Sequence, residues 1–202
     1  MSPGPRRIGV FGGSFDPPHS AHRALVDAAL QQLQLDELRI VPTGQAWHKA
    51  RSLSAPQHRL AMARLAFADL ARVVVDPRET LRSGPSYTVD TLRELHAEHP
   101  DCVFFLVIGG DQAQRLPTWH AWEEVVHLAT ICVAARPDVP GAAPFPAPVP
   151  PLPAGCRQLD FPQQAVSATD IRQRIAGGQG VDALVGPAVA RYIADHHLYL
   201  PT

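Results

Sequence analysis

Two histidines stand three residues apart in a stretch of mostly small residues, Gly12-Gly13-Ser14-Phe15-Asp16-Pro17-Pro18-His19-Ser20-Ala21-His22. A short apolar run precedes this stretch, and apolar residues at helical spacing follow it. Small residues let backbone amides approach a phosphate chain, and the positive end of the following helix also attracts anions. Both imidazoles can face the same phosphates because of their spacing. The stretch predicts a site that stabilises charge on phosphorus; the alternative is a plain strand-turn-helix connection with two surface histidines.

A second polar cluster lies late in the sequence and reads Val166-Ser167-Ala168-Thr169-Asp170-Ile171-Arg172. Ser167 can cap a helix, and Asp170 three residues later completes something like a capping box. Capping alone accounts for the serine, the threonine and the aspartate without any ligand. It leaves Arg172 unexplained, so the cluster also fits an anion site.

Three further groups of residues could contact a nucleotide or a planar ring. Gly109-Gly110-Asp111 follows the apolar run Val103 to Ile108, and an acidic residue there can accept hydrogen bonds from ribose hydroxyls. Ser86-Tyr87-Thr88 begins a predicted helix, whose positive end can meet a carboxylate. Trp119 offers a flat face for a planar ring. The structural alternatives are a common Gly-Asp turn, a helix cap at Ser86 and a core position for the tryptophan.

Strands alternate with helices along the chain, which predicts an α/β fold with a doubly wound, Rossmann-like parallel sheet and a small C-terminal helical portion. We predict strands at 7–11, 38–41, 72–75, 103–108, 129–134 and 157–160. We predict helices at 21–35, 56–67, 87–99, from 169 onward and at 187–196. The glycine pairs at 12–13 and 109–110 are predicted as turns at strand ends, where such sheets bind ligands.

The composition indicates one globular domain spanning residues 1–202. Eight of the 17 residues from 137 to 153 are proline, so this segment is predicted as a loop. A net charge of -1 provides no field for nucleic acid, and no apolar run approaches the roughly 18 residues of a membrane span. Three scattered cysteines fit a reducing cytoplasm. The oligomeric state stays open, with a homo-oligomer as one alternative.

The motifs together resemble a known family. The first stretch resembles the HxGH signature of the nucleotidylyltransferase superfamily, in the form found in bacterial nicotinate-nucleotide adenylyltransferases, although Ala21 stands where that family usually has glycine. The second cluster is similar to the SxTxxR motif of the superfamily. The remaining groups resemble the GxD, SYTxxT and PTW elements of the family. His48-Lys49 and Arg136 match basic residues that follow two of its strands.

This resemblance implies transfer of the adenylyl group of ATP to nicotinate mononucleotide, with release of pyrophosphate, in NAD biosynthesis. The implied catalytic residues are His19, His22, Lys49 and Arg172. The implied ATP contacts are Gly12, Gly13, Ser14, Phe15, Gly109, Asp111, Ser167 and Thr169. The implied contacts with nicotinate mononucleotide are His48, Ser86, Tyr87, Thr88, Trp119 and Arg136. Mg²⁺ is expected to arrive on the ATP phosphates, without a protein-built metal site.

Two alternatives stay open at the level of sequence. Pantetheine-phosphate adenylyltransferases share the HxGH and SxTxxR patterns but are usually shorter and lack the SYT and PTW elements. A non-catalytic adenine-nucleotide sensor is the other, with Ala21 as a mark of lost activity. The presence of both histidines and Arg172 argues against the sensor.

Overall fold

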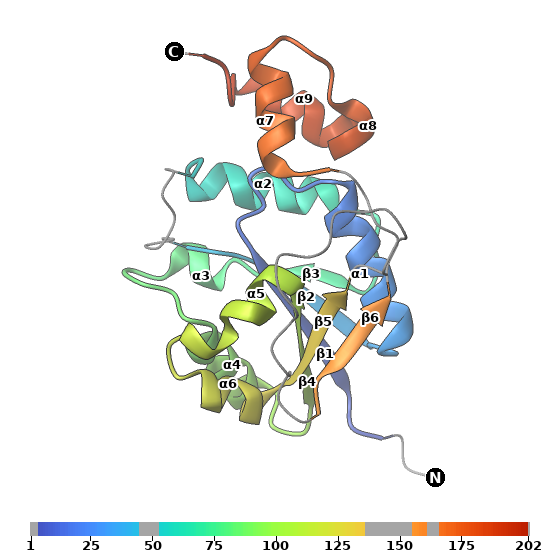
Figure 1. The fold of residues 1–202 in the computed structure, drawn as a ribbon, viewed down its shortest axis with the longest axis vertical. Helices are drawn as coiled ribbons and strands as arrows, with labels where there is room; N and C mark the ends of the chain where they lie inside the picture. Colours follow the sequence, from blue (N-terminus) through green and yellow to red (C-terminus); the bar gives the residue numbers. More distant parts are fainter. Residues whose placement is uncertain (1–3, 45–52, 136–154, 161–165, 202) are drawn as a thin grey trace.

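A computed structural model describes residues 4–44, 53–135, 155–160 and 166–201. Six strands form one sheet in the order β3-β2-β1-β4-β5-β6, and each neighbouring pair is parallel (Figure 1). The strands are β1 (Arg7–Gly13), β2 (Glu37–Pro42), β3 (Val73–Val75), β4 (Val103–Gly109), β5 (Thr130–Ala135) and β6 (Arg157–Asp160). The predicted doubly wound parallel sheet is therefore confirmed.

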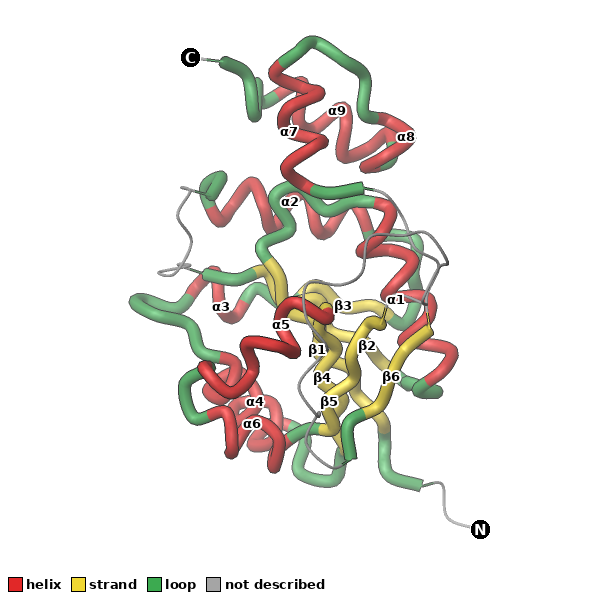
Figure 2. Tube along the Cα trace, in the orientation of Figure 1, coloured by secondary structure: helices red, strands yellow, loops and turns green. Residues whose placement is uncertain are grey.

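Helices cover both faces of the sheet because its central strands are apolar on both sides (Figure 2). One face packs against α1 (Ser20–Gln32) and α2 (Pro56–Ala66), with Phe11 and Phe105 in the shared core. The other face packs against α4 (Thr88–Glu98) and α6 (Trp122–Leu128), with Ile8 and Val10 in the core. Alternate residues of β1 thus serve opposite layers.

Two sequence expectations near β1 are wrong in detail. Gly12 and Gly13 do not form the turn; they extend β1 and lie beside Val41 and Pro42 of β2. The helix predicted for 21–35 ends at Gln32, and the chain reverses at Gln34, which has a left-handed φ of 49°. The turn between β1 and α1 therefore comprises residues 14–19. It follows the two glycines predicted to form it.

Short helices account for most of the remaining differences. The prediction omitted α3 (Arg78–Leu81), α5 (Gly110–Arg115), the 3-10 turn η1 (Leu116–Thr118), α6 and α8 (Asp182–Val185). Segments of three to seven residues show too few helical periods for a pattern of apolar spacing to reveal them.

The C-terminal helical portion consists of α7 (Ala168–Ala176), α8 and α9 (Pro187–Asp195). Figure 1 places these helices over α2, at the end of the molecule opposite the N-terminus. Met62 of α2 packs in a separate apolar cluster with Ile171, Val189 and Ile193. Within the described residues, no helix has the length and apolarity needed to cross a membrane.

Candidate active site

The two histidines of the first motif lie together at the start of α1. His19 is the residue that precedes the helix, and its backbone N–H donates to Nδ1 of His22 at 3.2 Å. The two imidazole rings stack with their centres 3.8 Å apart. Their spacing in sequence therefore does bring both rings to the positive end of one helix, as predicted.

Burial favours the neutral form of both histidines. Burial lowers the pKa of His19 to about 4. Burial lowers the pKa of His22 well below its usual value, and the charge that His19 can carry lowers it further. Because Nδ1 of His22 accepts a hydrogen bond, its proton is assigned to Nε2. His22 thus presents an Nε2–H donor.

Phe15 packs against His22 and so supports the stacked histidine rings. The residue is 1% exposed, and its side chain packs edge-on against Phe11 and Phe67, with its ring 5.1 Å from that of His22. Its backbone has a left-handed φ of 47°. A Cβ at Gly13 would lie 3.1 Å from the Phe15 ring, so glycine leaves room for it. Phe15 is therefore a core residue that supports the turn before α1.

The second motif starts α7 as predicted. Ser167 Oγ accepts from the Asp170 backbone N–H at 3.1 Å, which confirms the N-cap. The reciprocal contact differs from a capping box, because the Ser167 hydroxyl itself donates to Asp170 Oδ2 at 2.7 Å. Arg172 donates from Nη2 to Thr169 Oγ1 at 3.0 Å and from Nη1 to the Asp16 carbonyl at 2.8 Å. The two motifs, 156 residues apart, therefore meet.

Asp16 is the buried residue on which several segments converge. It is 2% exposed. Its Oδ2 accepts from the Ser54 backbone N–H at 3.1 Å, and its Oδ1 accepts from the Tyr199 hydroxyl at 2.6 Å. Sequence reasoning assigned no role to Asp16 or Tyr199, and nothing in the pattern around Tyr199 indicates one.

Arg59 of α2 donates hydrogen bonds to three loop residues next to the site. It is 1% exposed, and burial lowers its pKa. Its guanidinium donates to the carbonyls of Ser54 at 2.9 Å, Ser14 at 3.0 Å and Gly44 at 3.1 Å. A planar fork of donors suits such an arrangement better than the single ammonium of lysine. Sequence reasoning missed this residue, although a charge among the apolar positions of α2 was a visible signal.

The glycine-acid element lies beside the first motif because β4 pairs with β1. Strand order reverses between these two strands, and open α/β sheets bind ligands at such a switch point. Gly109 precedes α5, and a Cβ there would lie 2.8 Å from Asp111 Oδ1. Asp111 is exposed and accepts from Gln112 Nε2 at 2.8 Å.

The elements predicted for the acceptor also lie next to each other. The ring centre of Tyr87 is 4.4 Å from that of His120, so the start of α4 faces the segment after η1. Tyr87, not Ser86, immediately precedes α4, and the Ser86 hydroxyl donates to the Glu79 carbonyl at 3.4 Å; the capping alternative for Ser86 is therefore wrong. Trp119 is half-buried and packs on the core shared with α4 and α6, which fits the core alternative.

Gly44 lies between the first motif and the residues predicted to bind the acceptor. The neighbouring Thr43 N–H donates to the Gly13 carbonyl at 2.8 Å, next to the first motif. A Cβ on Gly44 would overlap the Glu79 carbonyl oxygen and lie 2.9 Å from Ser86 Oγ. Only a residue without a side chain fits between α3 and the start of α4.

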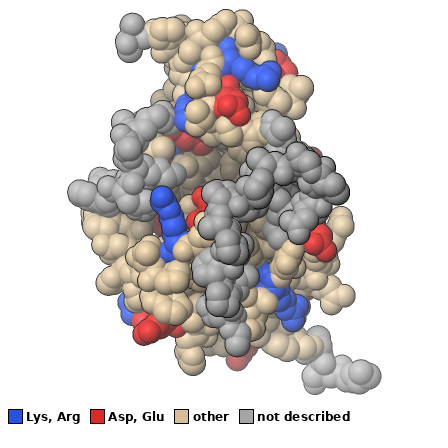
Figure 3. Space-filling view, viewed as in Figure 1, with Lys and Arg blue, Asp and Glu red and all other residues tan. Residues whose placement is uncertain are grey.

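Some predicted residues are not among those that the structure describes. His48, Lys49, Arg136 and the proline-rich segment 137–153 lie outside the described residues. Among the residues that are described, no group of three His, Cys, Asp or Glu side chains could hold a metal ion. The visible face is hollowed between the C-terminal helical portion and the sheet-bearing body (Figure 3).

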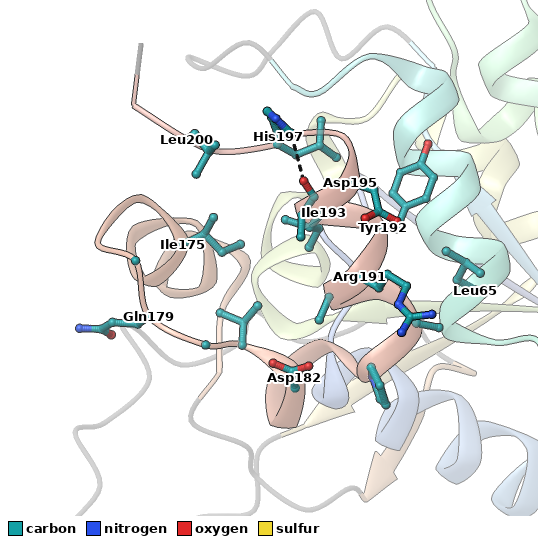
Figure 4. A pocket seen from close by; sticks show the side chains of 18 residues that line it. Leu65, Ile175, Gln179, Asp182, Arg191, Tyr192, Ile193, Asp195, His197 and Leu200 are labelled. Atoms are coloured by element: carbon teal, nitrogen blue, oxygen red, sulfur yellow. Dashed lines mark hydrogen bonds between the residues drawn. The ribbon is translucent and has the colours of Figure 1, made fainter.

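A separate groove of about 900 Å³ lies on the C-terminal helical portion (Figure 4). Leu65, Ile175, Arg191 and Tyr192 are among the side chains that line it. None of the predicted site residues does, so this groove is distinct from the site built by the motifs.

The comparisons define first the class of protein. The family model described as cytidylyltransferase-like matches residues 10–174, which include both the HxGH-like and the SxTxxR-like motif. Two solved structures of the nicotinic acid mononucleotide adenylyltransferase of Plasmodium falciparum share the fold. The complex with APC has a TM-score of 0.74 at 19% identity and covers 96% of this chain and 97% of its own. The complex with NaAD has a TM-score of 0.72 at 20% identity, with the same coverage.

Curated relatives narrow the class to one family. A protein of Albidiferax ferrireducens named "Probable nicotinate-nucleotide adenylyltransferase" is 61% identical over 195 residues, covering 96% of this chain and 98% of the relative. A protein of Methylibium petroleiphilum with the same name is 46% identical, covering 97% and 93%. The chain belongs to the nicotinate-nucleotide adenylyltransferase family.

Proposed function

We propose that this protein transfers the adenylyl group of ATP to nicotinate mononucleotide, giving nicotinate adenine dinucleotide and pyrophosphate. Membership of the family supports this activity. The observation that carries the proposal is the 2.8 Å hydrogen bond from Arg172 Nη1 to the Asp16 carbonyl. This bond brings together the HxGH-like and SxTxxR-like motifs, both of which are proposed to bind phosphate. They meet at the switch point where the strand order of the sheet reverses.

The triphosphate would lie between the first residues of α1 and those of α7. Backbone amides from Gly12 to Phe15 would meet its oxygens, with the Nε2–H of His22 and the guanidinium of Arg172 on either side. Ser167 and Thr169 would add hydroxyl groups, and His19 would stack behind His22. Gly109 and Asp111 would accept the ribose at the end of β4.

The reaction needs no protein nucleophile. A phosphate oxygen of nicotinate mononucleotide attacks the α-phosphorus of ATP, the new P–O bond forms in line, and the bond to the bridging β-oxygen breaks, so that pyrophosphate leaves. Catalysis then consists of positioning and charge stabilisation. Mg²⁺ would arrive with ATP, held by phosphate oxygens and water, and Lys49 would supply a further cation. An anion beside the histidines raises their pKa, so both can become charged once ATP is bound.

The acceptor would lie across the start of α4. The ring of nicotinate would stack on Trp119, and its carboxylate would meet the Thr88 amide or hydroxyl at the positive helix end. Ser86 and Tyr87 would complete this wall, with His48 and Arg136 toward the phosphate. A carboxylate gains from the helix end and a neutral amide does not, so nicotinate mononucleotide should be preferred to its nicotinamide counterpart.

The test is product formation from ATP and Mg²⁺ with three acceptors supplied separately: nicotinate mononucleotide, nicotinamide mononucleotide and 4'-phosphopantetheine. We expect pyrophosphate and a dinucleotide, resolved by chromatography, with nicotinate mononucleotide as the best acceptor. Turnover of phosphopantetheine would assign the chain to the other adenylyltransferase class. Binding of ATP without turnover of any acceptor would favour the sensor.

A further inference from the structure

Tyr199 follows α9 in the chain, and its side chain contacts the turn between β1 and α1. This turn, residues 14–19, is termed the phosphate turn. The Tyr199 hydroxyl donates to Asp16 Oδ1 at 2.6 Å across 183 residues of sequence. The same hydroxyl is 3.8 Å from Met62 Sδ, and the side chain packs in the apolar cluster that joins α2 to the C-terminal helical portion. Burial, followed by the nearby Asp16 charge, raises the pKa of the phenol. The hydroxyl therefore stays protonated and serves as a donor.

The backbone around Tyr199 is held in an unfavourable conformation. Tyr199 has a φ of 65° and His197 a φ of 52°, both in the left-handed region that bulky residues avoid. Such conformations persist where surrounding contacts determine them, and they gather at functional sites. The left-handed turn here directs the phenol inward to Asp16.

Asp16 transmits this contact to the predicted catalytic groups. The Asp16 carbonyl accepts from Arg172, and its carboxylate accepts from the Ser54 N–H. Asp16 precedes His19 by three residues in the chain. A displaced Asp16 would therefore shift Arg172 and the start of α1 together. A hydrogen bond to a buried carboxylate is among the stronger polar contacts in proteins.

We propose that Tyr199 is a positioning residue for adenylyl transfer, which couples the C-terminal helical portion to the phosphate turn through Asp16 and so fixes Arg172 relative to the histidines. This inference rests on the proposed function, because it assigns Tyr199 an effect on that reaction. Tyr199 would act through Asp16 and not on the substrate itself.

Tyr192 of α9 provides a matched control. Its hydroxyl lies 3.0 Å from His58 Nδ1, and its ring stacks on that of His196 at 4.0 Å. It belongs to the same apolar cluster as Tyr199, and its hydroxyl bond is made to α2 instead of to the phosphate turn. Removing either hydroxyl deletes one oxygen from this cluster, and the bond from Tyr199 to a carboxylate should cost more stability than the bond from Tyr192 to an imidazole.

The first experiment compares steady-state kinetics of Tyr199→Phe, Tyr192→Phe, Arg172→Ala and the Tyr199→Phe/Arg172→Ala double variant. We expect Tyr199→Phe to lower kcat by about 10-fold or more, the scale for one hydrogen bond to a charged group, and Tyr192→Phe to stay within about twofold of the parent. The double variant should be little slower than Arg172→Ala, because the two residues act through one contact. An unchanged kcat for Tyr199→Phe, or losses that simply multiply, would overturn the proposal.

A second measurement separates failure of this inference from failure of the proposed function. Hydrogen exchange of the segment 12–23, followed by mass spectrometry, needs no substrate. Tyr199→Phe should accelerate exchange there, and Tyr192→Phe should not. Exchange equal to that of the parent refutes the coupling whatever the activity. If the coupling is present but the parent does not use nicotinate mononucleotide, the proposed reaction fails and the role of Tyr199 in it fails too.

Discussion

The proposed nucleotide side of the site and its proposed acceptor side are built differently. Around the phosphate turn, Asp16 and Arg59 are almost fully buried, and each is bonded to several distant segments at 2.6–3.1 Å. On the acceptor side, Tyr87 is 41% exposed and the Ser86 hydroxyl makes a long bond of 3.4 Å. Trp119 is held there by apolar packing.

The contrast corresponds to two tasks. Charge that develops in a transition state is best stabilised by groups that need not move, so a cross-linked turn suits the phosphates. Recognition of a ring requires a surface and a favourable helix end, which packing alone can supply. Changes on the nucleotide side should therefore affect kcat most, and changes on the acceptor side should affect the KM of the acceptor.

The largest effect is expected for His22→Ala. Loss of the Nε2 donor should lower kcat by on the order of 100-fold or more, with little change in the KM for ATP, because the contact strengthens as charge develops. Steady-state kinetics will measure both constants, with His127→Ala, an exposed position on α6, as the control. A raised KM with normal kcat would remove the difference between the two sides.

Gly44→Ala tests the junction between the sides. The added methyl would overlap the Glu79 carbonyl, and overpacking of this kind should lower the free energy of unfolding by about 1–3 kcal/mol. Urea unfolding will measure the change. Gly180→Ala is the control, because the nearest atom to its Cβ would be at 3.8 Å, and it should stay within about 1 kcal/mol of the parent. Equal stability of both variants would show that the junction is loose.

Trp119→Ala should weaken the acceptor and spare the chemistry. Loss of a stacking face should raise the KM for nicotinate mononucleotide about 10-fold and weaken nicotinamide mononucleotide equally, because stacking does not distinguish the acid from the amide. Trp122→Ala, which removes a tryptophan packed on the same core, controls for lost stability. If both variants raise the KM alike, Trp119 acts only through packing.

The smallest effect concerns pH and the buried imidazole of His19. Its pKa of about 4 lies below the usual 6.5, so the unfolded chain binds more protons between these values. Stability must fall as the pH drops from about 6.5 toward 4, and His19→Asn should remove that part of the fall. We expect the two unfolding free energies to converge by on the order of 1 kcal/mol at pH 5, relative to pH 7. A constant difference would mean that His19 is not buried as described.

Local motifs were predictable from the sequence because their parts are neighbours in the chain. The spacing of His19 and His22, the Ser167 cap and the alternation of strands with helices all depend on nearby residues, and the structure has them. Their assigned roles in binding and catalysis stay predictions. The side on which the motifs meet followed from the general behaviour of parallel sheets.

The contacts of the supporting residues could not be predicted, because most of their partners are remote in sequence. Arg59 contacts carbonyl oxygens, which leave no trace in the types of the residues that carry them. The bond between Tyr199 and Asp16 depends on how α9 ends and on a left-handed turn that its sequence does not announce. The lowered pKa of both histidines likewise depends on burial, which spacing does not specify.

The meeting of Arg172 and Tyr199 with Asp16 also has a consequence for biosynthesis of the chain. Both bonds close loops of more than 150 residues, and long loops close late and slowly. A growing chain that already contains the whole sheet still lacks these two contacts. We therefore expect a nascent chain that ends near residue 165 to contain the phosphate turn without its bonds to Arg172 and Tyr199. The ability to bind ATP should then appear only after the last helices have emerged and docked on α2.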